Sequence, residues 1–595
     1  MAQSILLTET HRTGGPRPPR GHCPADLEAE EAIRKVLHEA MPAFGYLGEE
    51  TGSAALDAEF LWIVDPNDGT EAMQDGFRGH AVSIAVLNGH RVPVLGVVLA
   101  VNAPDDAGDL VAWASGCGSM TRNGQRVAPR AWPDRLAANS IVAVSQQADR
   151  HPDGNATAVA PARFRDIASI AYRLALAAVG DVDVAVSLNA PGAVDFAAGH
   201  ALVLAQGGKL VDDVGDEVAY TRQGHSHARL CFGGAPNLVS ELASRQWSIV
   251  LGSGFNGATP PRGYVPARLK PGLHVADVGV LSRAQGCLLG QLAGDALGSL
   301  TEFKSAHVIA ATYSDGGPYE LADGGTWNTI AGQPTDDSEL ALVLARTLVL
   351  EDRFSSPAIL DAYRQWKESD PFDIGGTTST GLAGNPNHSS QANGALMRVS
   401  PIGVWGWNKD PRLVADAARQ DAAITHPHPI CQEASAVFAV TVAAAIREGF
   451  TAKTAYEFAR NWTKSDCREP MVGEAIEKAG SGPHLERVQA GWVLLALNLA
   501  FFQLVANLSL EEALIAVVRR GGDTDTNAAI TGALLGAVQG RGSVPPQWTR
   551  SVLTCRPIWG RSYVRQPRPA TYWPTDALTL AERLLLADRA SDSRA

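Results

Sequence analysis

Several features that would place this chain in a simple class are absent from it. Its 595 residues include seven cysteines, none in a Cys-x-x-Cys pair, so we expect reduced thiols instead of a zinc ribbon or a disulfide framework. No run of about 18 apolar residues occurs, and residues 1–20 lack the apolar core of a signal peptide, so we expect neither a membrane span nor secretion. The net charge of −13 argues against a nucleic-acid surface, which needs a basic patch. These absences favour a cytoplasmic protein that binds neither nucleic acid nor membrane.

The chain is too long for one hydrophobic core, and its length predicts roughly two to four domains. Residues 1–23 are rich in Gly and Pro and are predicted to be disordered. Helix and strand patterns mix over residues 24–250, and a Pro/Gly-rich stretch without periodicity, residues 251–279, predicts a linker. Residues 280–590 are almost wholly helical in pattern. The sequence therefore predicts a multidomain protein with an N-terminal α/β domain and a C-terminal all-α domain.

Hydrophobic periodicity predicts individual elements in both halves. Apolar residues recur at helical spacing over residues 29–41. A strand-like run at 60–64 precedes an alternating stretch at 82–86 and an apolar run at 94–101, which together predict a hairpin. In the C-terminal half, residues 286–300, 338–350, 434–447, 491–506 and 527–538 read as buried helices, and residues 576–586 as a last docked helix.

Two acidic clusters in the C-terminal half lie about 190 residues apart, and each precedes an apolar helix. The clusters are Thr335-Asp336-Asp337 and Gly521-Gly522-Asp523-Thr524-Asp525-Thr526. Carboxylates and hydroxyls aimed from helix ends into one cavity would form an all-oxygen site of the kind that Mg²⁺ prefers. Aspartate and threonine are also ordinary helix caps, and for Thr335 alone the cap is the favoured interpretation. Capping explains at most one residue per helix, so it leaves the other acids without a role.

Three short motifs in the N-terminal half form a second constellation: Gly48-Glu49-Glu50, a string from Trp62 to Thr70 containing Asp65-Pro66-Asn67-Asp68-Gly69, and Val194-Asp195-Phe196-Ala197-Ala198-Gly199. The Pro-x-Asp-Gly turn can direct Asp65 and Asp68 toward one point, with the Asn67 carbonyl between them. Backbone N–H groups of the turn and Thr70 can then meet a phosphate. A solvated turn is the alternative for this segment by itself. With Glu49 and Asp195, the set suits metal-assisted hydrolysis of a phosphate monoester.

On these motifs, residues 24–247 resemble the inositol monophosphatase superfamily. The resemblance implies a layered αβαβα sandwich and two or three Mg²⁺ ions bound by Glu49, Asp65, the Asn67 carbonyl, Asp68 and Asp195. It implies that Thr70, paired with Glu49, positions the attacking water, and that Gly69, Thr70 and Ser169 lie near the phosphate. The chain departs from the family at Val194, where Trp is usual, and at Leu188, where a substrate-binding acid is usual. Ala168-Ser169-Ile170 replaces a Gly-Thr-Ala turn, so the substrate is not expected to be that of an inositol phosphatase.

Residues 281–590 resemble the ADP-ribosylglycohydrolase family. The resemblance rests on the two acidic clusters, on the segment from Gly290 to Gly298 that ends in Thr301-Glu302-Phe303, and on the segment from Gly394 to Pro401. It implies two Mg²⁺ ions with Thr335, Asp336, Asp337, Asp523, Asp525 and Thr526 as ligands. Asp336 or Asp337 would act as base, and Glu302 would bind metal or gate the substrate. Asp373 would lie beside the substrate, and Gly394, Ala395, Leu396, Met397, Gly521 and Gly522 would approach its ribose and pyrophosphate.

Two other groups of residues have simpler interpretations. His426 and His428 alternate with prolines, which makes convergence on one metal ion awkward, so a structural or substrate-lining role is favoured over a transition-metal site. Tryptophans 366, 405, 407 and 492 are expected to be core or pocket wall.

The leading hypothesis is a bifunctional Mg²⁺-dependent hydrolase. One half would remove ADP-ribose from a modified protein or small molecule, and the other would remove phosphate from a small phosphorylated metabolite. One alternative is an active glycohydrolase with a non-catalytic, regulatory phosphatase-like domain. A second alternative is a non-catalytic ADP-ribose sensor.

Overall fold

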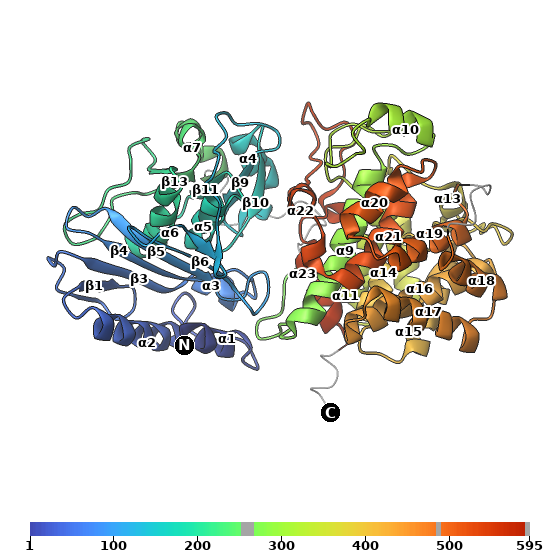
Figure 1. The fold of residues 1–595 in the computed structure, drawn as a ribbon, viewed down its shortest axis with the longest axis horizontal. Coiled ribbons are helices and arrows are strands. Elements are labelled where there is room, and N and C mark those ends of the chain that lie inside the picture. Colours follow the sequence, from blue (N-terminus) through green and yellow to red (C-terminus); the bar gives the residue numbers. More distant parts are fainter. Residues whose placement is uncertain (252–266, 483–489, 589–595) are drawn as a thin grey trace. The chain divides into compact units, whose positions relative to one another are not determined.

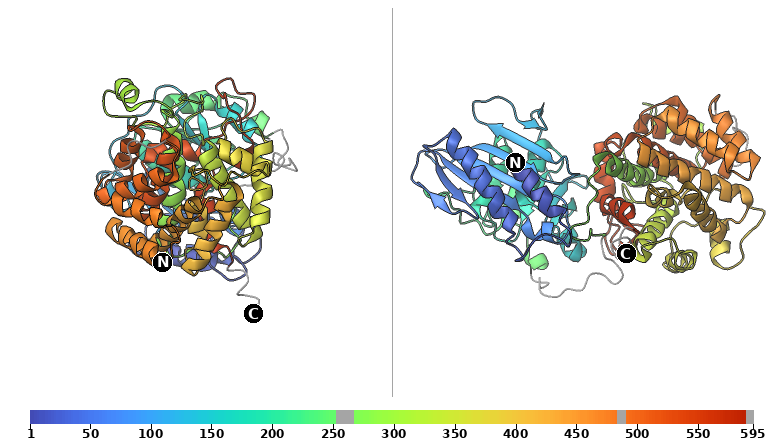
Figure 2. Two further views of the ribbon diagram at one scale, coloured as in Figure 1. Left: turned by 90° about the vertical axis from the view of Figure 1, so that its right-hand side faces the viewer. Right: turned by 90° about the horizontal axis from the view of Figure 1, so that it is seen from below.

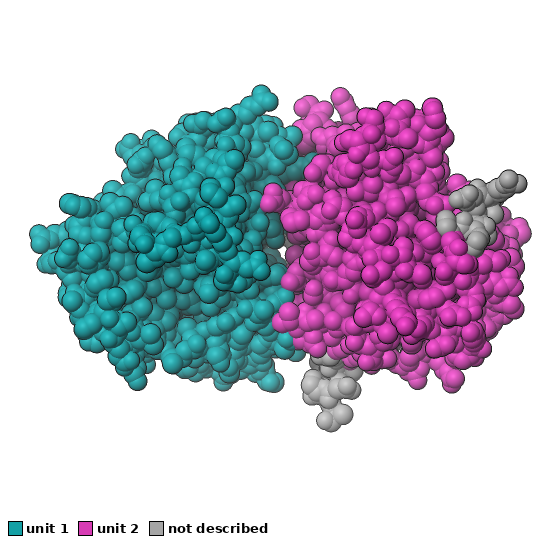
Figure 3. All heavy atoms as spheres, in the orientation of Figure 1, with its two compact units in different colours: residues 1–262, 268–276 teal, residues 263–267, 277–595 magenta. Residues whose placement is uncertain are grey.

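The computed structural model describes residues 1–251, 267–482 and 490–588, and the chain divides into two compact units (Figure 3). Unit 1 comprises Met1–Arg262 and Arg268–Ala276, and unit 2 comprises Gly263–Ala267 and Asp277–Ala595. Of the expected linker, residues 252–266 lie outside the described residues. Residues 268–276 belong to unit 1, and helix α9 (Val278–Gly298) begins where the linker was expected to end.

Unit 1 contains two β-sheets. The first has the order β2-β1-β3-β4-β5-β6-β7-β8, and the second has the order β10-β9-β11-β13-β12. The strands of the first are β1 (Gly45–Gly48), β2 (Ser53–Ala54), β3 (Leu61–Asp68), β4 (Ala81–Leu87), β5 (Pro93–Ala100), β6 (Asp109–Ala114), β7 (Thr121–Arg122) and β8 (Gln125–Arg126). Those of the second are β9 (Ile141–Val144), β10 (Arg163–Asp166), β11 (Val184–Ser187), β12 (Lys209–Val211) and β13 (Cys231–Gly234). The predicted hairpin is confirmed, because β4 pairs antiparallel with β5.

Helices complete the layers of unit 1 (Figure 1). Helices α5 (Ile170–Val179) and α6 (Ala193–Ala205) pack between the two sheets, where Leu174 and Phe196 are fully buried. Helices α1 (Ala2–Thr10) and α2 (Pro24–Ala40) cover the other face of the first sheet, and α4 (Pro152–Val159) and α7 (Pro236–Ala243) pack on the second. Short helices η1 (Ala148–Arg150), α3 (Thr70–Gln74) and α8 (Ser248–Leu251) complete the unit. This is the αβαβα sandwich that the sequence predicts.

The prediction that residues 1–23 are disordered was wrong. Residues 2–10 form helix α1, and Leu6 is fully buried in the apolar layer between the helices and the first sheet. The Gly/Pro-rich segment that follows is held by Glu9, whose carboxylate accepts hydrogen bonds from the backbone and the guanidinium of Arg17. Composition missed this order because the stabilising contacts are made with partners distant in the sequence, as in the hydrogen bond from Gln3 to the Val101 carbonyl.

Unit 2 is helical throughout its described residues, which confirms the predicted all-α domain. After α9 come α10 (Ala306–Thr312), α11 (Asp336–Glu351), α12 (Ser356–Glu368), α13 (Gly376–Leu382), α14 (Ser400–Trp405), α15 (Pro411–Thr425), α16 (Pro429–Glu448), α17 (Ala452–Ser465) and α18 (Pro470–Ala479). They are followed by α19 (Val493–Ala506), α20 (Leu510–Val518), α21 (Thr524–Gln539), η2 (Arg541–Ser543), α22 (Pro546–Leu553), η3 (Ala570–Tyr572) and α23 (Ala577–Leu586). Helix α16 is long and apolar enough to cross a membrane, but 89% of its most apolar window is buried inside the structure.

Helices α9 and α21 lie side by side with their backbones in direct contact (Figure 1). Figure 2 shows the helices of unit 2 from two further sides. Glycines recur every fourth residue along α9, which places them on one face of the helix. A Cβ added to Gly290 would lie 2.2 Å from the Gly532 carbonyl oxygen, and one added to Gly294 would lie 2.2 Å from that of Ala528. At Gly298 the nearest atom would be the Asp525 Cα, 2.4 Å away. The glycine face therefore brings the C-terminal end of α9 against the start of α21, where the second acidic cluster lies.

Candidate metal centres

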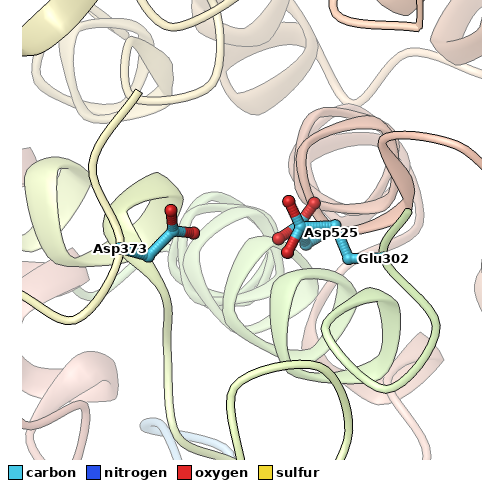
Figure 4. A group of neighbouring side chains, drawn as sticks. All are labelled: Glu302, Asp373 and Asp525. Carbon is cyan, nitrogen blue, oxygen red and sulfur yellow. The ribbon is translucent and has the colours of Figure 1, made fainter. Parts of the chain in front are cut away.

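In unit 2 the predicted acidic residues converge at the ends of α9, α11 and α21. Asp295 lies near the end of α9, residues 335–337 open α11, and residues 523–526 open α21. Glu302 follows α9, and Asp373 precedes α13. One carboxylate oxygen from each of Glu302, Asp373 and Asp525 lies within 4.8 Å of the others, and the three side chains point toward one another (Figure 4). Sequence segments far apart thus supply one buried cluster of oxygen atoms.

Hydrogen bonds fix the orientation of Thr335 and Asp337 in this cluster. Thr335 is the N-cap residue of α11, but its side chain makes no capping hydrogen bond. Its hydroxyl instead lies 2.9 Å from Asp295 Oδ1 and 3.1 Å from Asp337 Oδ2. Asp295 also accepts the backbone N–H groups of Thr335 and Ser338. The interpretation of Thr335 as an ordinary cap was therefore wrong, because the buried Asp295 carboxylate takes its hydroxyl.

The second acidic cluster is held in a similar way by neighbouring polar groups. The Asn393 amide donates to Asp523 Oδ2 at 2.7 Å, and the Thr526 backbone N–H donates to Asp525 Oδ1 at 2.9 Å. The Trp327 indole N–H donates to Glu302 Oε2 at 2.6 Å. These contacts limit the rotamers of the acids before any ligand arrives, which is what a preorganised site requires.

Burial and mutual repulsion make these acids hard to ionise. Burial, followed by the charges of Asp336 and Glu302, raises the pKa of Asp373 to about 9. Burial raises the pKa of Asp295 and of Glu302 to about 7. It also raises the pKa of Asp337 well above its usual range, with the charge of Asp336 adding to the effect. A cation bound among them would replace the protons that such a cluster otherwise retains.

The glycines predicted to approach the substrate have specific packing partners. A Cβ on Gly394 would lie 2.9 Å from the His426 ring, and one on Gly521, where φ is +73°, would lie 2.4 Å from the Lys304 carbonyl oxygen. Gly522 also has positive φ, +84°, and its N–H donates to the same carbonyl. Ala395, Leu396 and Met397 are buried as whole residues, and the Met397 carbonyl accepts a hydrogen bond from Gln291.

In unit 1 the register of strands β1 and β3 brings acids of the predicted N-terminal cluster together. Strands β1 and β3 are parallel with Gly48 opposite Val64, which sets Glu49 beside Asp65, and the two carboxyl groups are hydrogen-bond partners. Asp68 Oδ2 accepts the Ser169 hydroxyl at 2.5 Å. Asp195 at the start of α6 completes the set, since its charge acts on Asp65 and Asp68. Burial, with the charges of Asp68 and Glu49, raises the pKa of Asp195 to about 8.

The predicted pairing of Thr70 with Glu49 was wrong. The Thr70 hydroxyl donates to Asp26 Oδ2 at 2.8 Å, and Asp26 Oδ1 accepts the Asn67 side-chain amide at 2.8 Å. Burial raises the pKa of Asp26 to about 6. Gly69, which lies between Asn67 and Thr70, has φ +105°, the left-handed conformation that the predicted tight turn requires. Asp26, and not Glu49, is therefore the carboxylate partner of the Thr70 hydroxyl.

Comparison with known proteins agrees with this geometry. The family model for ADP-ribosylglycohydrolase matches residues 276–593, more than half of the chain. The chain belongs to the ADP-ribosylglycohydrolase family. Residues 22–250 match the family model for inositol monophosphatases. The protein thus joins an inositol monophosphatase-like domain, in unit 1, to an ADP-ribosylglycohydrolase domain, in unit 2.

Individual relatives of each domain share moderate sequence identity with it. A putative ADP-ribosyl glycohydrolase of Acanthamoeba polyphaga mimivirus is 29% identical over 308 residues, which cover 46% of this chain and 92% of the viral protein. An ADP-ribosylarginine hydrolase of Pseudomonas putida is 27% identical over 299 residues, 46% of this chain and 74% of that protein. An inositol-1-monophosphatase of Caulobacter vibrioides is 41% identical over 63 residues, 10% of this chain and 25% of that protein.

The residues present in the glycohydrolase domain fit a divalent cation. The cluster consists of carboxylate and hydroxyl oxygens, the donors that hard cations prefer. Asp337 Oδ1 is buried and has no hydrogen-bond partner in the described part of the chain, an arrangement that a cation would satisfy. The phosphatase-like domain also offers an all-oxygen cluster with raised pKa values.

Sequence reasoning missed Asp26, Asp295, Asn393 and Trp327, which orient the predicted residues. Asp26 accepts hydrogen bonds from Asn67 and Thr70, which lie 41 and 44 positions later in the sequence, so no local motif indicates its role. Asp295 was visible in the motif from Gly290 to Gly298, and its signal was an acid within an otherwise apolar helix.

The histidines and tryptophans named in the sequence have specific contacts in the fold. His426 is buried and hydrogen-bonded to Thr425, and His428 caps α16. Trp366 and Trp405 are buried, and the indoles of Trp407 and Trp492 bond to Leu585 and Gln391.

Proposed function

We propose that the glycohydrolase domain is a Mg²⁺-dependent hydrolase that cleaves the glycosidic bond at C1″ and releases ADP-ribose from a modified protein or small molecule. The observation that carries this proposal is the convergence of Asp336, Asp337, Asp523 and Asp525, with Glu302 and Asp373, from separate segments into one buried oxygen cluster. Packing gives no reason to bury so many acids together, because each costs free energy unless a cation or proton compensates it. The family and the named activities of the relatives agree with this reading.

Thr335, Asp336, Asp337, Asp523, Asp525 and Thr526 are the proposed ligands of two Mg²⁺ ions. Bound Mg²⁺ would supply Lewis-acid polarisation and a template for the substrate hydroxyls. Asp336 or Asp337 accepts the proton of the attacking water. Asp336 is held in place, because its Oδ2 accepts the Gly375 N–H at 3.1 Å and its carboxylate is also hydrogen-bonded to the Asp373 carboxyl group.

Glu302 and Asp373 have a separate part in the proposed reaction. They face the ligand acids from the turn after α9 and the segment before α13 (Figure 4). Burial raises the pKa of Glu302 in the metal-free cluster, and Glu302 lies outside the proposed ligand set, so it is the group proposed to give a proton to the departing acceptor. Trp327 keeps the Glu302 side chain in place for this step.

The test is release of ADP-ribose, measured by mass spectrometry with Mg²⁺, from arginine-linked and serine-linked ADP-ribosyl peptides. We expect release by the wild type, loss of at least 100-fold in Asp523→Ala, and no change in Asp361→Ala, an exposed acid of α12. Release by Asp523→Ala at the wild-type rate would refute the assignment of the site. Failure of the wild type on both peptides, with Mg²⁺ bound, would favour a non-protein acceptor or the sensor alternative.

We further propose that the phosphatase-like domain hydrolyses a small phosphorylated metabolite with two or three Mg²⁺ ions at Glu49, Asp65, the Asn67 carbonyl, Asp68 and Asp195. The pair of Thr70 and Asp26 supports this proposal, because a threonine hydroxyl that donates to a carboxylate can accept a hydrogen bond from the attacking water and take its proton while passing its own to Asp26. The domain is then catalytic and the protein bifunctional.

Phosphate release from a panel of phosphomonoesters tests this second activity. Thr70→Ala should abolish it, whereas Thr157→Ala, on the exposed face of α4, should leave it unchanged. A wild-type protein that binds Mg²⁺ to this domain but hydrolyses no ester would support the regulatory alternative, which Leu188 and Val194 motivated.

A further inference from the structure

Unit 1 contains a cavity of about 690 Å³ that the proposed reactions do not use. It lies between the C-terminal half of α2, strand β1 and residues 51–55. Its volume is within the range of small-molecule sites, roughly 300–1,000 Å³. Neither Asp26 nor any proposed metal ligand of this unit is among the residues that line the cavity. The basic residues of the cavity lie about 12–18 Å further along α2 than Asp26. The cavity is therefore lined by other residues than those of the phosphatase-like centre.

Aromatic side chains form one wall of this cavity. Phe44, Tyr46 and Trp62 line it, and the Phe44 and Trp62 ring centroids are 5.6 Å apart. Trp62 is 92% buried, since 8% of it is exposed, and its indole N–H has no hydrogen-bond partner in the described ranges. Met41 adds an exposed apolar side chain at the rim. Such a wall stacks well against a planar aromatic ring.

Basic side chains also line the cavity, although the chain as a whole carries a net charge of −13. Arg34, Lys35 and His38 line it from α2, together with the acid Glu31. The Arg34 guanidinium is fixed, because it lies 4.8 Å from the Tyr46 ring centroid and donates to the Thr51 carbonyl at 3.0 Å. Lys35 is exposed and forms no ion pair within the described residues. This arrangement offers a positioned guanidinium and a free ammonium to an anionic group.

The cavity wall is also connected to the metal cluster. Glu30, fully buried on α2, accepts the backbone N–H groups of Glu50 and Thr51 and the Thr51 hydroxyl. Thr51 lines the cavity, whereas Glu49 is a proposed metal ligand. A ligand that orders Thr51 would therefore act on the segment that carries Glu49.

We propose that this cavity binds an aromatic ring that carries an anionic group, the chemistry of a nucleotide. Two sources share this chemistry: a free nucleoside monophosphate, and ADP-ribose formed by the proposed glycohydrolase reaction. The inference goes beyond both proposed activities and does not depend on either, because it rests on the cavity walls alone.

Hydrogen–deuterium exchange of the full chain, with a chelator present, locates binding of AMP as the probe. We expect AMP to slow exchange of residues 41–55. The effect should be lost in Lys35→Glu and in Ala54→Glu, which place negative charge in the cavity from exposed positions. Lys453→Glu, an exposed charge reversal on α17, is the matched control and should behave as wild type. Unchanged thermal unfolding of the three variants shows that they fold.

Calorimetry with a ligand series separates the two features of the cavity. AMP should bind about tenfold or more tightly than adenosine, which lacks the anion, and than ribose 5-phosphate, which lacks the ring. Affinities for ADP-ribose and AMP are compared by the protection of residues 41–55, which excludes binding at the glycohydrolase site. Tighter binding of ADP-ribose by this measure would identify the reaction product as the source, and tighter binding of AMP would identify the free nucleotide. No protection of residues 41–55, protection that persists in both cavity variants, or equal binding of adenosine and AMP would each overturn the proposal.

Discussion

Replacement of Gly290 by alanine tests whether the close crossing of α9 and α21 builds the glycohydrolase site. The new Cβ would lie 2.2 Å from the Gly532 carbonyl oxygen and 2.9 Å from its carbon. Both are backbone atoms of a buried helix, so no side-chain rotation relieves the clash and the helices must separate by roughly 1 Å.

The magnitude follows from two opposing terms. Overpacking of a dense core costs about 1–3 kcal/mol, and a contact between backbones belongs at the upper end. Alanine recovers up to about 1 kcal/mol through its higher helix propensity. We expect a net loss of about 2 kcal/mol, which lowers the Tm of a domain of this size by roughly 3 °C. Because the crossing also sets Asp295 against the start of α11 and Gly298 against Asp525, Mg²⁺ affinity should fall as well.

Gly279→Ala on the same helix is the matched control. There the new Cβ meets only the ends of flexible side chains, Arg283 Nη1 at 3.0 Å and Asp277 Oδ1 at 3.3 Å. We expect it to be neutral or stabilising by up to about 1 kcal/mol. Calorimetric unfolding with and without Mg²⁺ measures both variants. If Gly290→Ala has the same Tm and the same Mg²⁺ affinity as Gly279→Ala, the glycine face does not position the metal-binding residues.

Three further predictions follow from the two centres. Because the pKa values of acids such as Glu302 and Asp373 are raised, the folded protein binds more protons than the unfolded chain between about pH 5 and 8. With a chelator present, Tm should therefore fall as pH rises through this window, and Mg²⁺ should raise Tm more at pH 8 than at pH 6. A Tm that does not change with pH would contradict this prediction. Trp327→Phe removes the indole hydrogen bond that lowers the pKa of Glu302, so kcat for ADP-ribose release should fall about tenfold and the alkaline limb of its pH profile should move to higher pH. Trp407→Phe, whose indole donates to the Leu585 carbonyl, should change neither. Thr70→Ser keeps the hydroxyl and should retain most phosphatase activity where Thr70→Ala loses it; equal activity of the two variants would exclude the hydroxyl from the reaction.

Motifs local in the sequence predicted much of what the structure contains. The change from mixed patterns to helical ones near residue 280 indicated the two folds, and the paired aspartates at 336–337 and 523–525 indicated the buried cluster. Each of these signals lies within one element or turn, where periodicity and residue type are informative by themselves.

The features that were missed depend on contacts between distant segments. Asp26 is an ordinary residue in the first turn of a helix until the fold brings Thr70 to it. Helix α1 is ordered because Leu6 finds an apolar surface that its own composition does not predict. The spacing of glycines at every fourth position from Gly286 to Gly298 is typical of a helix face that packs closely on another helix, but the sequence does not indicate which helix packs there.

The central claim is that the acidic cluster of unit 2 holds the metal that makes ADP-ribose release possible. Its most direct test is the rate of release, under single-turnover conditions, as Mg²⁺ is titrated into the metal-free wild type and into Asp523→Asn, which keeps the size of the side chain but removes its charge. The account predicts a rate that rises with Mg²⁺ to a plateau in the wild type and stays at background in the variant. A wild-type rate that is independent of Mg²⁺, or a variant that reaches the same plateau at the same Mg²⁺ concentration, would contradict it.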